Sequence, residues 1–220
     1  TAVDLEVVHG EIPDDLYGAY MRNGPNPVFK PRGTYHWFDG DGMVHGVYFR
    51  DGRASYVRKW VKTRALRQEI ERGRVELSGI MGPFDLSRVG DGAAASNPDY
   101  CKDTSNTTLN FFNGRILSQW YNAGRVHALD PLTLDTLGEE DFGGALHTTL
   151  NAHPKVDPRN GEYLDYDYGD FKPYLTYYVV GADGKLKHEA RIDLPGPRLP
   201  HDTTFTPNYT SLHDFPLYHD

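Results

Sequence analysis

Two of the ten histidines in this sequence, His153 and His201, each lie at the edge of a predicted strand, where an imidazole could bind a metal ion. His153 stands in the segment Asn-Ala-His-Pro-Lys-Val-Asp-Pro, residues 151–158. Pro154 fixes its own φ and favours an extended backbone at His153, so the imidazole is held by a stiff segment. Neutral imidazoles suit Fe, Zn, Cu or Ni alike, and a separation of 48 positions is too loose to define a metal site. For one histidine taken alone, a structural role at a strand end is the favoured interpretation.

The elements around His153 are predicted from turn signals. The hexapeptide Asp-Pro-Arg-Asn-Gly-Glu at 157–162 indicates a tight turn, because Asn-Gly is a strong short hairpin signal. The sequence therefore predicts that His153 lies near the end of one strand, just before a turn into the next.

The whole chain has the composition of an all-β protein. Its 220 residues include 23 Gly, 15 Pro, 15 Tyr and 10 Phe, which favour many short strands over helices. We predict strands at 4–8, 34–38, 43–49 and 54–62, the last three as one antiparallel sheet, and a helix at 64–74. About a dozen strands follow the same rhythm, with turns every 8–12 residues or so, which leaves a sandwich, a barrel and a propeller as the alternatives.

Charge and composition exclude several functions. A formal net charge of −8 offers no basic face for nucleic acid and little attraction to anionic lipid. The single cysteine, Cys101, rules out an internal disulfide framework and predicts a reducing, cytoplasmic location. There is no apolar run long enough to span a membrane. The sequence does not begin with Met and stops at Asp220 without a capping signal, so we expect it to be part of a longer protein.

Other catalytic motifs are not found. The chain has no Gly-rich phosphate loop, no Gly-x-Ser-x-Gly elbow and no Cys-x-x-Cys pair. The tetrapeptide Asp-Gly-Asp-Gly at 39–42 is faintly similar to a calcium loop but lacks the later Glu, so a hairpin turn is the better prediction.

Several motifs, in order along nearly the whole chain, resemble the carotenoid cleavage oxygenase family, which includes stilbene-cleaving enzymes. The matching motifs are Gly-Glu-Ile-Pro at 10–13, Leu-Tyr-Gly at 16–18, Arg-Asn-Gly-Pro-Asn-Pro at 22–27, Phe-Asp-Gly-Asp-Gly-Met-Val-His at 38–45, Leu-Asp-Pro at 129–131, Thr-Leu-Asp-Thr at 133–136, Ala-His-Pro-Lys at 152–155 and His-Asp-Thr-Thr-Phe-Thr-Pro-Asn-Tyr at 201–209. Each motif is weak alone, and the ordered set is strong.

The resemblance implies a seven-bladed β-propeller with a non-haem Fe(II) held by four histidines on its axis. Residues 1–220 would be the N-terminal portion of this single domain, roughly its first three blades. His153 matches the first ligand and His201 the second, and the other two would lie beyond Asp220. In the family a glutamate accepts a hydrogen bond from a ligating histidine, and the resemblance places Asn122 at that position here. Its neutral amide predicts a less basic ligand.

The implied activity is O2-dependent cleavage of a conjugated C=C bond into two carbonyl products. The substrate would be a hydrophobic alkene, either a carotenoid or apocarotenoid or a stilbene, and its uptake could involve weak peripheral membrane contact. The sequence leaves the substrate, the bond cleaved and the oligomeric state open.

The remaining histidines receive structural interpretations. We expect His45 to pack or hydrogen-bond, His147 to be structural, and His213 and His219 to be strand histidines near the surface despite their likeness to the ligand motif. His9, His36, His127 and His188 are interpreted as surface or turn histidines.

Two alternatives to the oxygenase remain. A propeller scaffold without catalysis is suggested by Asn122 and by the ligands that the sequence does not contain. A propeller hydrolase or lactonase with a metal such as Ca²⁺ would need acidic axial residues, which the two histidine motifs do not supply.

Overall fold

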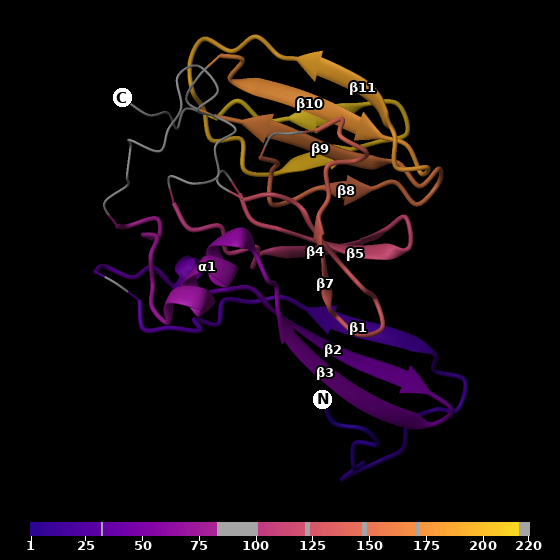
Figure 1. Cartoon of the computed structure of the whole chain (residues 1–220). Coiled ribbons are helices and arrows are strands. Elements are labelled where there is room, and N and C mark those ends of the chain that lie inside the picture. The colour runs from indigo at the N-terminus through magenta and orange to yellow at the C-terminus, as the bar shows by residue number, and fades with distance from the viewer. Residues whose placement is uncertain (32, 83–100, 122–123, 147–148, 170–171, 216–220) are drawn as a thin grey trace.

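The computed structural model describes residues 1–31, 33–82, 101–121, 124–146, 149–169 and 172–215. Within them the chain is nearly all β, as predicted, and has four antiparallel sheets and one α-helix (Figure 1). The strands are β1 (Gly18–Arg22), β2 (Met43–Arg50), β3 (Arg53–Trp60), β4 (Thr108–Phe112), β5 (Arg115–Gln119), β6 (His127–Leu129), β7 (Thr136–Glu139), β8 (Lys155–Val156), β9 (Tyr163–Tyr168), β10 (Leu175–Val180), β11 (Leu186–Arg191), β12 (Thr203–Phe205) and β13 (Thr210–Leu212).

The first sheet has the order β1-β2-β3. Its β2–β3 hairpin is closed by Asp51 and Gly52, whose positive φ values of 49° and 68° match the mirror-image turn that suits strand twist. Two predictions were wrong here. Residues 34–38 do not form a strand, because the His36 side chain accepts from Phe38 N and Asp39 caps the same 3₁₀ turn (Trp37–Asp39), and β1 pairs with β2 instead. Residues 4–8 also form no strand.

The predicted helix is confirmed as α1 (Arg64–Arg72). It begins at Thr63, whose Oγ1 accepts from Leu66 N at 3.1 Å, and it ends at Gly73, where the left-handed φ of 68° suits glycine. Thr63 Oγ1 also donates to the Asp103 carbonyl at 3.1 Å, which ties the helix start to the segment that enters β4.

The second and third sheets are four-stranded meanders in chain order, β4-β5-β6-β7 and β8-β9-β10-β11. The Asn113-Gly114 and Asp157–Glu162 turns close hairpins as predicted. Strand β7 was not predicted, because it is short and follows a segment that was interpreted as a turn. The strand predicted before the turn at 157–162 is present as the two residues of β8. The last two strands, β12 and β13, form a separate pair.

The hydrophobic core lies in layers between the sheets. Alternate residues of β5 face opposite layers, since Ile116 packs toward the first sheet and Leu117 toward the third. The layer between the first and second sheets contains Val44, Val61, Ile116, Leu129 and Leu134. The layer between the second and third sheets contains Phe112, Leu117, Val126, Ala128, Phe142, Leu146, Leu150, Tyr163, Tyr178 and Val180. Strand β5 is therefore buried on both faces, and polar side chains on it are shielded from water.

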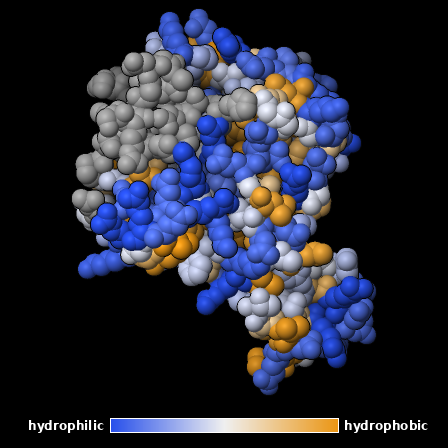
Figure 2. Space-filling model, in the orientation of Figure 1, coloured by the Kyte–Doolittle hydropathy of each residue, from blue (hydrophilic) through white to orange (hydrophobic). Residues whose placement is uncertain are grey.

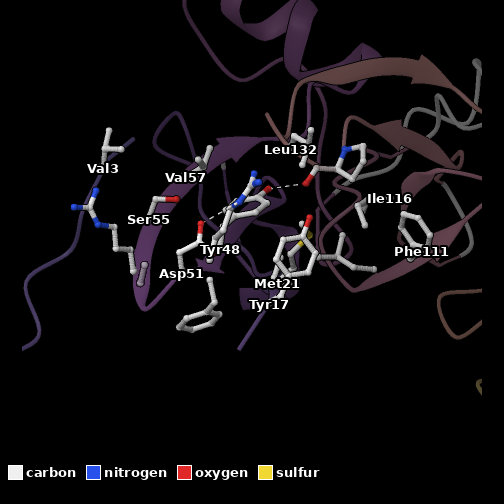
Figure 3. A pocket seen from close by; sticks show the side chains of 18 of the residues that line it. Val3, Tyr17, Met21, Tyr48, Asp51, Ser55, Val57, Phe111, Ile116 and Leu132 are labelled. Carbon is white, nitrogen blue, oxygen red and sulfur yellow. Dashed lines mark hydrogen bonds and ion pairs between the residues drawn. The ribbon is translucent and has the colours of Figure 1, made fainter. Parts of the chain in front are cut away.

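A cleft of about 950 Å³ opens where the first sheet diverges from the second (Figure 3). Tyr48 donates to the Pro131 carbonyl at 2.8 Å across it, and Met21, Val57 and Ile116 contribute apolar walls. Neither His153 nor His201 lines this cleft. The face shown in Figure 2 is mainly hydrophilic, with apolar side chains scattered over it. Among the described helices, none has the length and apolar character that a membrane crossing requires.

Candidate metal centre

The structure brings His153 and His201 together, as predicted. Their Nε2 atoms are 3.3 Å apart, and their rings meet edge to face with centroids 4.9 Å apart at 79°. His153 lies two residues before β8 and His201 two residues before β12, so each histidine enters the first strand of its sheet. The prediction that His153 lies near the end of a strand was therefore wrong in detail, because strand β8 begins only at Lys155, two residues after His153.

Lys155 and Asp202 tie the two histidine segments to each other. Lys155 Nζ donates to the His153 carbonyl at 3.0 Å and to Asp202 Oδ1 at 2.7 Å. Asp202 Oδ1 also accepts from Thr203 N at 2.7 Å. Burial raises the pKa of Asp202, but these two hydrogen bonds together with the charges of Lys155 and His153 leave the pKa below its usual range. The residues that follow each histidine in its motif thus hold the pair together.

Tyr166 in β9 forms hydrogen bonds to both histidine segments. Its backbone carbonyl accepts from Asn151 N at 2.8 Å, and its hydroxyl donates to the carbonyl of Pro200, the residue before His201. The side chain is fully buried. One residue therefore contacts the chain just before each histidine, and sequence reasoning missed it because a strand tyrosine reads as core.

The electrostatics favour a neutral imidazole at His153. Burial lowers the pKa of His153, the neighbouring His201 lowers it further, and Asp202 opposes the shift. A neutral imidazole keeps the lone pair that a metal needs. Two nitrogens that each lie about 2.1 Å from one ion, at an angle between about 90° and 105°, are about 3.0–3.3 Å apart. The observed separation of 3.3 Å fits two ligands of one ion.

Tyr121 contacts the outer side of this pair. Its ring meets that of His201 edge to face, with centroids 5.5 Å apart at 86°, and restricts the rotation of the imidazole. Burial raises the pKa of the Tyr121 hydroxyl, so it stays protonated at neutral pH. The sequence offered no signal for this contact.

The other predicted residues are placed as follows. Asn122, His147 and His219 lie outside the described residues. His213 joins no metal-binding group, and within the described ranges no cluster of three or more His, Cys, Asp or Glu side chains could hold a metal. His45 bonds to the Tyr56 hydroxyl as expected. His127 is a correction: it is buried in β6 rather than at the surface, with Nδ1 3.0 Å from the Arg125 carbonyl.

The acidic motif at 39–42 is structural. Asp39 accepts from His36 N and from Ile80 N, at 2.9 and 2.8 Å. Asp41 Oδ1 lies 2.8 Å from Lys102 Nζ, which also lies 2.6 Å from Glu69 Oε2, and all three side chains are buried. A calcium site is excluded because the Asp41 carboxylate is already neutralised by an ammonium group.

The comparisons with known proteins show the family of this chain. A family model described as retinal pigment epithelial membrane protein matches residues 1–220. Carotenoid 9,10(9',10')-cleavage dioxygenase 1 of Phaseolus vulgaris is 37% identical over 96% of the chain. The chain belongs to the carotenoid cleavage oxygenase family. It spans 40% of the length of that relative.

Solved structures of the carotenoid cleavage oxygenase family have the same fold as this chain. A lignostilbene dioxygenase of Pseudomonas brassicacearum superposes with a TM-score of 0.85 at 34% identity, over 100% of this chain and 45% of that one. A Synechocystis apocarotenoid oxygenase variant gives 0.78 at 31% identity, over 96% and 45%. The Synechocystis enzyme has also been solved in a cobalt-substituted form, with a TM-score of 0.77 at 32% identity, over 94% and 45%.

Proposed function

We propose that this chain is the metal-binding N-terminal portion of a non-haem Fe(II) dioxygenase. The reaction adds O2 across a conjugated C=C bond, which breaks, and each carbon leaves as a carbonyl. The observation that carries the proposal is the pair of Nε2 atoms 3.3 Å apart, contributed by two segments 48 residues apart in the chain. Membership of a family whose relatives are named carotenoid cleavage dioxygenases supports the reaction class.

His153 and His201 would hold the iron, which supplies the redox chemistry for O2 when bound. The protein's own contribution is orientation. Lys155 and Asp202 fix the two segments, Tyr166 supports both, and the Tyr121 ring limits the rotation of His201. The hydrophobic substrate would lie beside the exposed edge of the histidine pair, and Asn122 would act on a ligating histidine as a neutral acceptor.

The fold proposal follows from the sheets. Two four-stranded meanders in chain order, with the histidines at the entry to successive sheets, are typical of propeller blades. We propose a seven-bladed propeller, of which residues 1–220 form the first three blades or so and the N-terminal part of its single domain. The same proposal places the protein in a reducing, cytoplasmic compartment with its one cysteine buried.

Iron content tests the ligand assignment. The full-length polypeptide that carries this chain is reconstituted with Fe(II) without oxygen, as wild type, as His153→Ala and as His213→Ala. We expect about one iron per polypeptide in the wild type and in His213→Ala, and a loss of iron and cleavage in His153→Ala. Unchanged iron and activity in His153→Ala would overturn the assignment. A wild type with neither iron nor turnover would favour the scaffold.

Substrate class is tested with an apocarotenoid and a stilbene supplied to the same preparation. The lignostilbene dioxygenase and the apocarotenoid oxygenase both superpose on this chain, so both substrates are offered. Two aldehydes per alkene consumed support dioxygenase cleavage. A single hydroxylated product would contradict it.

A further inference from the structure

Three polar side chains are buried together between the second and third sheets. Gln119 ends β5, while Tyr163 and Asp165 lie on the same face of β9, and all three side chains are at most 1% exposed. Gln119 Nε2 donates to Asp165 Oδ2 at 2.8 Å. The Tyr163 hydroxyl lies against Gln119 Oε1 and also 3.2 Å from Asp165 Oδ2. We call these three residues the Gln119 network.

The hydrogens available decide the charge of this network. The Tyr163 hydroxyl contacts two oxygens, Gln119 Oε1 and Asp165 Oδ2, but has one hydrogen to donate. If Asp165 were ionised, one of these contacts would be between two oxygens without a hydrogen. If Asp165 is protonated, its Oδ2–H donates to Tyr163 Oη and the tyrosine donates to Gln119 Oε1. Every contact is then a hydrogen bond.

The surroundings of Asp165 agree with a neutral acid. Burial raises its pKa to about 8, hydrogen bonds from Gln119, Tyr166 N and Tyr163 oppose the rise, and the charged neighbour Asp167 is another carboxylate. A protonated acid accepts from Gln119 Nε2 while donating to Tyr163. An asparagine at this position could not do both, because its amide nitrogen accepts nothing.

The Gln119 network is connected to the metal centre through the backbone. Gln119 Nε2 also donates to the Asn151 carbonyl at 2.9 Å, two residues before His153. Asp165 Oδ1 accepts from Tyr166 N at 2.8 Å, and Tyr166 in turn holds Asn151 N and the Pro200 carbonyl. Asn151 is therefore held on both sides by groups that the network orients.

We propose that Gln119, Tyr163 and a neutral Asp165 are positioning residues for His153, acting through the Asn151 carbonyl. The inference rests on the proposed function, since it assigns these residues to a metal ligand. Apolar side chains could fill the same buried space as these three polar residues. Among the described residues, the one hydrogen bond from the network to the segment of His153 runs from the Gln119 N–H to the Asn151 carbonyl. Its effect is on the placement of the imidazole, with a smaller effect on folding.

Cobalt binding tests the proposal. The full-length polypeptide that carries this chain is titrated with Co(II), and the affinity and the ligand-field absorption spectrum are recorded for the wild type and for a triple variant, Gln119→Met, Tyr163→Phe and Asp165→Leu. Replacing all partners together leaves no unpaired polar side chain in the network, so folding should survive. We expect Co(II) affinity to fall about 10-fold, the low end for changes behind a metal ligand, with an altered spectrum.

The controls separate positioning from stability and from ligation. Val61→Ala removes buried contacts in the other core layer and should leave the affinity and the spectrum unchanged. If His153→Ala binds Co(II) like the wild type, the metal site itself is wrong. If His153→Ala loses binding while the triple variant keeps wild-type affinity and spectrum, the positioning role is overturned. Should the triple variant not fold, Gln119→Met alone decides by the same two readouts.

Discussion

Replacing Lys102 by Met tests how the protein holds its buried charges. Lys102 lies between Asp41, at 2.8 Å in the loop before β2, and Glu69, at 2.6 Å in α1, with side-chain exposures of 7%, 2% and 0%. The substitution keeps most of the length of the unbranched side chain and removes the ammonium group. Two carboxylates then remain buried without a cation.

The magnitude follows from what each carboxylate keeps. Glu69 Oε1 still accepts from Glu76 N at 3.1 Å, and Asp41 Oδ2 still accepts from Val28 N at 3.0 Å, but neither is neutralised. Removing one partner of a buried ion pair costs about 3–5 kcal/mol, and we expect Lys102→Met to lower the free energy of unfolding by this amount.

Urea unfolding followed by tryptophan fluorescence measures the loss. Lys59→Met is the matched control, because Lys59 pairs with Asp135 at 2.6 Å with side chains 35% and 58% exposed, and it should cost at most about 1 kcal/mol. Adding Glu69→Gln to Lys102→Met should recover part of the loss. If Lys102→Met lowers the free energy of unfolding no more than Lys59→Met does, the prediction that Lys102 compensates the buried charges of Asp41 and Glu69 is refuted.

Two further changes have defined outcomes. Tyr166→Phe leaves the Pro200 carbonyl without its donor. We expect it to lower the free energy of unfolding in urea by about 1–3 kcal/mol and to lower the iron content. A variant with wild-type iron content would refute the proposal that Tyr166 positions His201. Burial lowers the pKa of His127 to about 4 from its ordinary 6.5, so the stability due to this neutral histidine is complete above pH 6.5 and is lost as the pH falls toward 4. At pH 5 the wild type should have lost about 2 kcal/mol from this group, and His127→Phe should show a pH dependence flatter by that amount; equal slopes in urea midpoints between pH 7 and 5 would contradict the assignment.

The fold was predictable where turns are marked by residue type. The Asp51-Gly52 and Asn113-Gly114 pairs locate hairpins because positive φ at both positions favours these residues. The strand predicted at residues 34–38 was wrong because the caps formed by His36 and Asp39 stabilise a 3₁₀ turn in this aromatic, strand-like segment. Short strands such as β8 are defined by their partner, which local sequence does not show.

The candidate site was predictable only through resemblance. His153 and His201 share no local signal, and their 3.3 Å approach depends on two sheets packing together. The supporting groups are harder still. Lys155 pairs with a carboxylate 47 residues away. Strand alternation assigns Gln119 and Asp165 to the core, but it does not predict the hydrogen bond between them.

Strand β9 supports both histidines of the candidate metal centre. The carbonyl and the hydroxyl of Tyr166 each form a hydrogen bond to the chain near one histidine. Both histidine segments are therefore bonded to the same residue of β9. When the sheets shift relative to one another, the two imidazoles should travel together, and their separation should change less than their position in the molecule. Movement of the sheets should therefore displace the two histidines as a unit, and the distance between their Nε2 atoms, on which binding of one ion by both depends, should stay nearly constant.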